Sequence, residues 1–174
     1  MQNTITQTNH GEREAVEVTI AGALYHLRFE FRETLFLENR FPGDSVLDLI
    51  NDLAFVRVGA DGLMELDDEG LPIQVTVGSH KAVHACLWAC LRRTKPDITG
   101  EDVLDLIEAH TEAGGELSEL AFAVQRAWFL GGAGQKALRE HKKKVEARDK
   151  AKAESNLVSE SGSDEPSSPP AAPG

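Results

Sequence analysis

Apolar and polar residues alternate near the start of the chain, as they do in β-strands. One alternating run ends just before Ala21-Gly22, and a second follows this dipeptide. A period of two with glycine in the connection is typical of an antiparallel hairpin. We therefore predict strands at about Ala15 to Ile20 and Ala23 to Phe31.

The spacing then changes to that of short helices. Leu35 to Leu37 suit one or two helical turns, which Phe41-Pro42-Gly43 breaks. Asp44 or Ser45 is predicted to cap a second helix. The apolar positions on the inner face of this helix are Val46, Leu47, Leu49, Ile50 and Leu53.

An acidic region with three glycines, Gly59 to Gly70, separates this helix from the next apolar run. We predict an exposed loop there, because glycine and aspartate favour turns. Apolar residues alternate from Leu71 to Val77, which predicts a short strand.

Three longer helices are predicted to follow. Ser79 caps the first, which ends near Arg93 before Pro96. Thr99 starts the second, with acids in its first turn. The third runs from about Glu116 to Leu130 and has apolar residues on more than one side. The apolar stripe of the first of these helices consists of Val83, Cys86, Leu87, Cys90 and Leu91.

Length and composition fit a single domain. The chain has 174 residues, of which 41% are hydrophobic. We predict an α+β fold that is mainly helical, with an N-terminal β-hairpin packed on a small helical bundle in residues 15–130. Residues 1–14 are expected to be flexible and residues 131–154 to form a charged, solvated helical extension. Residues 155–174, rich in Ser, Pro and acids, are expected to be a disordered tail.

The charge of the body is opposite to that of the extension. The formal net charge is −11; residues 1–130 carry ten Lys and Arg against 22 Asp and Glu, whereas residues 131–154 carry eight against four. DNA binding requires basic side chains that displace counterions, so nucleic acid is not an expected partner of the body. The chain has neither a membrane-length apolar run nor a signal-like leader, so we expect a cytoplasmic protein without a membrane partner.

Candidate metal ligands and nucleophiles are few. His80 and His84 lie four apart on a predicted helix, but His80 is followed by Lys81 instead of the glutamate of zinc proteases. We interpret both as surface histidines. Cys86 and Cys90 lie one turn apart in an apolar run and are interpreted as core residues.

Other motifs lack residues that their chemistry needs. Asp67-Asp68-Glu69 does not have EF-hand spacing, and the glycines from Gly131 to Gly134 are not followed by the Gly-Lys-Ser/Thr of a phosphate loop. We interpret these segments as a solvated loop and a break between helices. No Gly-x-Ser-x-Gly elbow occurs. We therefore expect a non-enzymatic protein without a metal or cofactor.

Aromatic residues in the predicted helices have two interpretations. They fill the core of a small domain, or they form an acid-rimmed groove for partner helices. The candidate partner-binding residues are Leu87, Trp88, Leu91, Phe122, Trp128 and Phe129. Lys142 to Lys144 are candidates for nucleic-acid contacts, although interspersed acids favour a solvated helix face.

Several segments together resemble a known family. They are the hairpin VEVTIAGALYHLRFEF, the turn TLFLENRF, and LWACLRRTKPDITGEDVLDLIEAH followed by ELAFAVQRAWFLGG. Their hydrophobic positions and helix caps are similar to those of the tail assembly chaperones of long-tailed bacteriophages and related gene transfer agents. The resemblance covers about Val16 to Leu130.

The resemblance implies non-enzymatic work in the bacterial host cytoplasm. Proteins of this family coat the long, hydrophobic tape measure protein, keep it soluble until tail tube subunits polymerise around it, and are absent from the mature virion. In many phages a programmed frameshift also yields a longer form, and a slippery adenine run is compatible with Lys142 to Lys144. The implied partners are the tape measure protein, the tail tube protein, a frameshifted longer form and further copies of the chain.

Two alternatives stay open. A small transcriptional or nucleic-acid adaptor would use the basic extension around Lys142 to Lys144. A structural head-tail connector or tube component would instead assemble permanently into virions.

Overall fold

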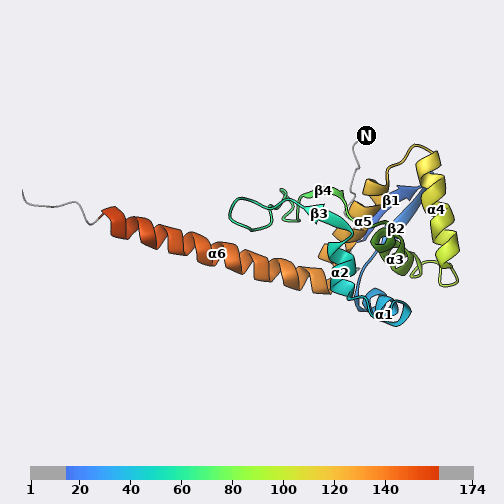
Figure 1. Ribbon diagram of the computed structural model, residues 1–174, viewed down its shortest axis with the longest axis horizontal. Coiled ribbons are helices and arrows are strands. Elements are labelled where there is room, and N and C mark those ends of the chain that lie inside the picture. The colour runs from blue at the N-terminus through green and yellow to red at the C-terminus, as the bar shows by residue number, and fades with distance from the viewer. Residues whose placement is uncertain (1–14, 161–174) are drawn as a thin grey trace, which may run out of the picture.

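The computed structural model of the chain describes residues 15–160. A body of short strands and helices carries one long projecting helix, α6 (Figure 1). The predicted α+β fold, mainly helical with an N-terminal hairpin, is confirmed. The flexibility predicted for residues 1–14 and the disorder predicted for residues 161–174 concern positions outside the described residues.

The N-terminal hairpin consists of β1 (Val16–Ile20) and β2 (Ala23–Leu27), which pair antiparallel. Its turn has positive φ at both central residues, 49° at Ala21 and 82° at Gly22. Two positive φ angles match the right-handed twist of a two-residue hairpin. The predicted turn is therefore confirmed, and the alternating side chains of β1 face the core.

The second strand is shorter than predicted. Residues after Leu27 leave the sheet, and α1 (Phe31–Arg40) begins where the strand was expected to end. Glu30 and Glu33 form a capping box in which the main-chain N–H of Glu30 donates to the Glu33 carboxylate at 2.8 Å. This reciprocal cap satisfies N–H groups at the helix start and sets the boundary. Alternation continued through Phe31, but the side chain of Phe31 is 80% exposed.

The middle of the chain forms a second, longer hairpin. Ser45 caps α2 (Val46–Asn51), and β3 (Ala54–Val56), which the sequence did not predict, pairs antiparallel with β4 (Gln74–Val77). The intervening segment is not the simple exposed loop that we predicted. Two further antiparallel bridges, Val58 with Met64 and Leu66 with Pro72, extend the pairing toward its tip.

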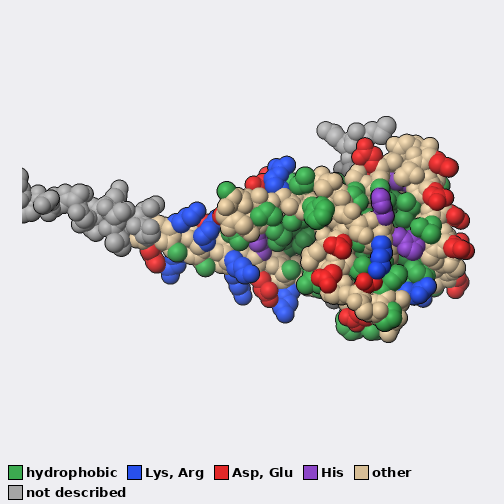
Figure 2. Space-filling view, viewed as in Figure 1, with side chains coloured by type: hydrophobic (Ala, Val, Ile, Leu, Met, Phe, Trp, Pro, Cys, Tyr) green, Lys and Arg blue, Asp and Glu red, His purple; other side chains and the backbone are tan. Residues whose placement is uncertain are grey.

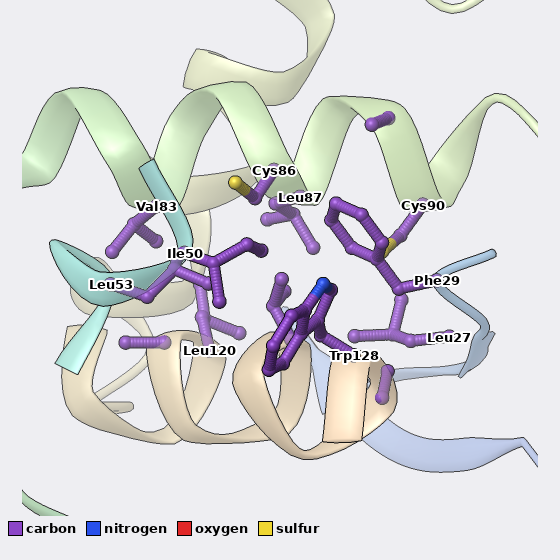
Figure 3. Close-up of a cluster of buried hydrophobic side chains, with 14 of the residues drawn as sticks. Leu27, Phe29, Ile50, Leu53, Val83, Cys86, Leu87, Cys90, Leu120 and Trp128 are labelled. Atoms are coloured by element: carbon purple, nitrogen blue, oxygen red, sulfur yellow. The ribbon is translucent and has the colours of Figure 1, made fainter. Parts of the chain in front are cut away.

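The remaining helices of the body enclose the core. They are α3 (His80–Leu91), α4 (Gly100–Glu112) and α5 (Leu117–Leu130). The hydroxyls of Ser79 and Thr99 cap α3 and α4 as predicted. Buried side chains from the N-terminal hairpin and α2 meet between α3 and α5 (Figure 3). The predicted stripe of α3 is buried in full, which places Cys86 and Cys90 in the core as expected.

Helix α6 (Gly132–Glu160) differs from the predicted solvated extension in two respects. Its first half packs on the body, since Leu138 and His141 are buried. Its helical conformation also continues six residues past the start predicted for the disordered tail, since extending an existing helix forms one hydrogen bond for each residue that is fixed. Gly131 lies so close to the carbonyl oxygen of Phe29 that a Cβ atom would collide with it.

Candidate functional site

Most of the predicted partner-binding residues belong to the core. Trp88 and Phe122 are half-buried, whereas the other four are at most 8% exposed. The buried four are Leu87, Leu91, Trp128 and Phe129. Burial favours the core interpretation for these four side chains, and Figure 3 shows Leu87 of α3 and Trp128 of α5 in the buried cluster between the two helices. Trp88 points to a different surface.

An apolar groove of about 620 Å³ lies between α1, α3 and the start of α4. We call it the α1–α3–α4 groove. The rings of Phe36 and Trp88 meet edge to face there, with centroids 5.1 Å apart. The indole N–H of Trp88 donates a 2.9 Å hydrogen bond to the carbonyl of Ile98, which holds the ring in place. Leu104, 47% exposed, adds an aliphatic wall from α4.

Two arginines cover part of this aromatic floor. The guanidinium carbon of Arg40 lies 5.3 Å from the ring centre of Trp88. That of Arg92 lies 4.4 Å from the ring centre of Phe36. Both distances are within the range of cation–π attraction, so each guanidinium is held against a ring face while its side chain stays exposed. Among the described residues, Glu101 is the one acidic side chain that lines the groove.

The predicted histidine pair is divided between two environments. His80 is exposed as predicted. His84 is half-buried, and its Nε2 lies 2.8 Å from the carbonyl oxygen of Gly100 at the start of α4. The surface interpretation of His84 is therefore wrong, because α4 packs across this position of α3. His84 helps to form the α1–α3–α4 groove.

The two thiols are chemically protected. Burial raises the pKa of Cys86 to about 12. Burial also raises the pKa of Cys90, and Cys86 and Glu33 nearby act in the same direction. Nucleophilic cysteines need a lowered pKa and access to solvent, and neither condition is met here. The two residues serve packing.

The acidic hairpin connection is paired with basic residues of α5 and α6. The segment containing Asp67 is ordered by its own side chain, which accepts hydrogen bonds from the N–H groups of Glu69 and Leu71, each at 2.9 Å. Arg126 of α5 pairs with Glu69. The interpretation of this segment as a solvated loop is therefore only partly correct, because packing against α5 gives it fixed partners.

The basic extension also contacts this hairpin. Arg148 pairs with Asp61, and Nε2 of His141 lies 3.1 Å from the carbonyl oxygen of Met64. Lys142 to Lys144 are exposed. Figure 2 shows basic and acidic side chains interspersed along the projecting helix α6. Acidic residues between β3 and β4 thus offset part of the positive charge of α6.

A second exposed apolar area lies on the β3–β4 hairpin, which sequence periodicity did not single out. Phe55, Val58 and Val75 are each more than half exposed. Figure 2 shows hydrophobic side chains gathered over this hairpin. Alternation marked only Val75 as a strand residue, and it does not tell which face of a two-stranded hairpin is covered.

Metal binding and membrane insertion each need a recognisable arrangement of side chains within residues 15–160. That part of the chain holds no cluster of three or more His, Cys, Asp or Glu arranged for a metal ion. None of its helices is long and apolar enough to cross a membrane. Comparison of the chain with protein-family models, curated proteins and solved structures found no match.

Proposed function

We propose that this chain is a tail assembly chaperone of a long-tailed bacteriophage. It binds the tape measure protein, keeps it soluble in the host cytoplasm, and helps to recruit tail tube subunits during tail morphogenesis. The observation that carries the proposal is the α1–α3–α4 groove, whose apolar floor includes the side chains of Phe36 and Trp88. The family resemblance of residues 16–130 agrees with it.

The groove suits an amphipathic helix. Such a helix buries a few apolar anchors in a hydrophobic groove and leaves its polar face in water. Trp88 and Leu104 are available from neighbouring helices as contacts for these anchors. A tape measure protein would present apolar helix faces repeatedly along its length, so many copies with modest affinity would bind through multivalency.

The charge of the body supports the same role. Acidic side chains gather over α4 (Figure 2). Glu101, Asp105 and Glu108 of this helix are exposed, and Glu101 lines the groove. Bound copies would give the complex a negative surface, and net charge far from zero opposes aggregation. The proposal also includes departure from the finished virion and a frameshifted longer form that begins near Lys142 to Lys144.

Coexpression tests the proposal. The chain is produced in bacteria together with the long, helical, apolar-rich protein encoded beside it, and the soluble fraction of that partner is measured. We expect the wild-type chain to keep the partner soluble and to copurify with it. Leu104→Asp should abolish copurification, because it places a charge in the apolar groove.

Leu47→Asp is the matched control. Leu47 is also an exposed helical leucine, at 55% against 47% for Leu104, but it lies on α2 and does not line the groove. Equal loss of copurification in both variants, or a partner that stays insoluble with the wild-type chain, would contradict the proposal. Detection of the chain in purified virions would favour the structural alternative instead.

A nucleic-acid adaptor is tested separately through the exposed lysines of α6. An adaptor predicts DNA binding that weakens with salt and is lost when Lys142, Lys143 and Lys144 are changed to glutamate. If the chain is a tail assembly chaperone, the wild type should show no salt-dependent DNA binding at about 150 mM salt, which is close to physiological ionic strength.

A further inference from the structure

The C-terminal segment of the chain has a composition that complements the α1–α3–α4 groove. Residues 161–174 read SGSDEPSSPPAAPG and contain two adjacent acids, Asp164 and Glu165, followed by a Pro-x-x-Pro motif from Pro166 to Pro169. Lys and Arg are absent from these fourteen residues. The segment therefore combines negative charge with the residue type that aromatic grooves bind in extended ligands.

The groove offers the opposite charge at the matching place. Arg40 and Arg92 lie over the rings of Trp88 and Phe36, so a ligand that reaches the aromatic floor passes two guanidinium groups. Guanidinium groups bind carboxylates through charge-assisted hydrogen bonds. Residues 1–130 carry an excess of acids over bases, whereas the charged side chains that line the groove are Arg40, Arg92 and Glu101.

The groove also fixes an orientation for such a ligand. Carboxylates belong beside Arg40 and Arg92, on the side of α1 and α3, because Glu101 on the α4 side would repel them. The proline residues that follow would then lie against apolar side chains near Leu104. Serine hydroxyls between the prolines are able to donate to Glu101.

A chain cannot place this segment in its own groove. Helix α6 has 29 residues, which corresponds to a length of about 43 Å, and it runs away from α1, α3 and α4 (Figure 1). Fourteen residues span at most about 50 Å when fully extended. An extended segment of that length reaches from the end of α6 back to its start, but it is too short to continue across the body to the groove. The acids are nearer to the helix end than the last residue is, which shortens their reach further.

We propose that the acidic, proline-containing C-terminal segment of one copy docks in the α1–α3–α4 groove of another copy. Such a contact joins two different surfaces, so it links copies head to tail and leaves a free groove and a free tail at the two ends. It also covers the apolar floor until another ligand displaces the segment. The inference shares the groove with the proposed function, but its test requires no tape measure protein.

The experiment measures self-association of the full-length chain by sedimentation velocity over a range of concentrations. Two charge-reversed variants are compared with wild type. The groove variant carries Arg40→Glu and Arg92→Glu, and the tail variant carries Asp164→Lys and Glu165→Lys. We expect the wild type to form concentration-dependent oligomers and each variant alone to associate roughly tenfold more weakly, since reversal turns two attractions into repulsions.

Mixing the two variants is the decisive step. In the mixture, the acidic tail of the groove variant meets the unchanged groove of the tail variant, and the lysine-containing tail meets the glutamate-containing groove. Association should therefore return. A control with Lys136→Glu and Lys143→Glu lowers the net charge by as much as the groove variant does, but on α6 and outside the groove, and should associate as wild type does.

Several results would overturn the inference. The first is a wild-type chain that stays monomeric at about 100 μM, a concentration at which a weak contact should form. The second is a pair of variants that associate as strongly as wild type does. The third is a mixture of the two variants that does not recover association. Circular dichroism establishes that the groove variant is folded. The tail variant changes residues outside the body, so its loss of association cannot be assigned to unfolding of the core. Copurification with a tape measure protein is unaffected by these outcomes, so the two proposals fail independently.

Discussion

The side-chain amide of Gln74 donates a 2.9 Å hydrogen bond to Oε1 of Gln125, and this contact joins the second hairpin to α5. Gln125 is buried, with 3% of its surface exposed. Its own amide donates to the carbonyls of Ala54 at 2.8 Å and Ile50 at 3.3 Å. One polar side chain on α5 thus connects β4, β3 and α2 inside an otherwise apolar interface.

Gln125→Leu should destabilise the fold. The substitution leaves the carbonyl of Ala54 and one N–H of Gln74 without this partner, whereas the carbonyl of Ile50 still accepts the N–H of Leu53. A buried polar group left unsatisfied costs about 1–3 kcal/mol. We expect the free energy of unfolding to fall by roughly 2–4 kcal/mol, measured by urea denaturation. Gln135→Leu on α6 is the control and should change it by less than about 0.5 kcal/mol. Equal stability of both variants would show that the network is not net stabilising.

The buried thiols should react only after unfolding. Because burial raises the pKa of Cys86 to about 12 and that of Cys90 in the same direction, neither forms much thiolate at pH 8 in the native state. We expect alkylation, detected by mass spectrometry, to modify neither cysteine in native buffer. Both cysteines should be modified in about 8 M urea, a concentration at which a typical small domain is unfolded. Rapid modification of the native chain would contradict the described burial.

The same shift predicts a loss of stability at alkaline pH. An unfolded cysteine loses its proton near its ordinary pKa of 9.0, whereas the folded Cys86 keeps its proton until about pH 12. The unfolded state therefore binds fewer protons in this window, and the free energy of unfolding should decrease as pH rises from 9 toward 12. Below pH 9 this contribution is unaffected. A Cys86→Ala, Cys90→Ala variant should show a shallower decrease than wild type.

Thr99→Ala should affect both the start of α4 and one carboxyl group. The Thr99 hydroxyl donates to the Asp102 carboxylate at 2.7 Å, and this bond, with a main-chain bond from Thr99, lowers the pKa of Asp102. In the variant, the pKa should rise toward the ordinary 3.8, as measured by NMR titration. The lost cap should lower Tm by about 2–4 °C at neutral pH.

The sign of the associated pH dependence is opposite to that of the thiols. A pKa that is lower in the folded state stabilises the protein above the ordinary pKa, and this stabilisation is lost as pH falls below 3.8. The stability difference between wild type and Thr99→Ala should therefore shrink in acid. An unchanged difference between about pH 7 and about pH 3, which lies below the ordinary value of 3.8, would show that Asp102 takes no part in the cap.

Amide hydrogen exchange should be slower in the first half of α6 than in its second half. Leu138 and His141 are buried against the body, whereas the residues after Arg148 are exposed where side chains are described. Hydrogen exchange is expected to be slower near residues 135–142 than near residues 149–154. Leu138→Ala should remove that protection while α3 stays protected, and Lys143→Ala should leave the pattern unchanged. Uniform exchange along α6 would contradict its packing.

Local signals explain which elements were predictable. Ser79 and Thr99 cap helices through hydrogen bonds to residues three positions later, so the pattern is contained in a few consecutive letters. The buried stripe of α3 follows from helical spacing in the same way. The end of β2 was missed because alternation through Phe31 competed with a capping box made of two glutamates, a less familiar form of that motif.

The candidate site was less predictable. Phe36, Trp88 and Leu104 come from three helices that meet only through tertiary packing. Helical spacing identifies Trp88 as an aromatic residue on α3, but the same argument applies to Trp128, which is buried. Periodicity reports that a face is apolar and does not tell whether another element covers it.

The amino-acid sequence alone determined the helical class, the caps, the apolar stripes and the contrast between an acidic body and a basic extension, because these depend on residue type and local spacing. Tertiary structure decided which aromatic residues are exposed, placed Arg40 and Arg92 over the rings of one groove, and paired the basic extension with the acidic hairpin. Those properties depend on contacts between residues far apart in the chain, whose closeness is set by packing of the whole core.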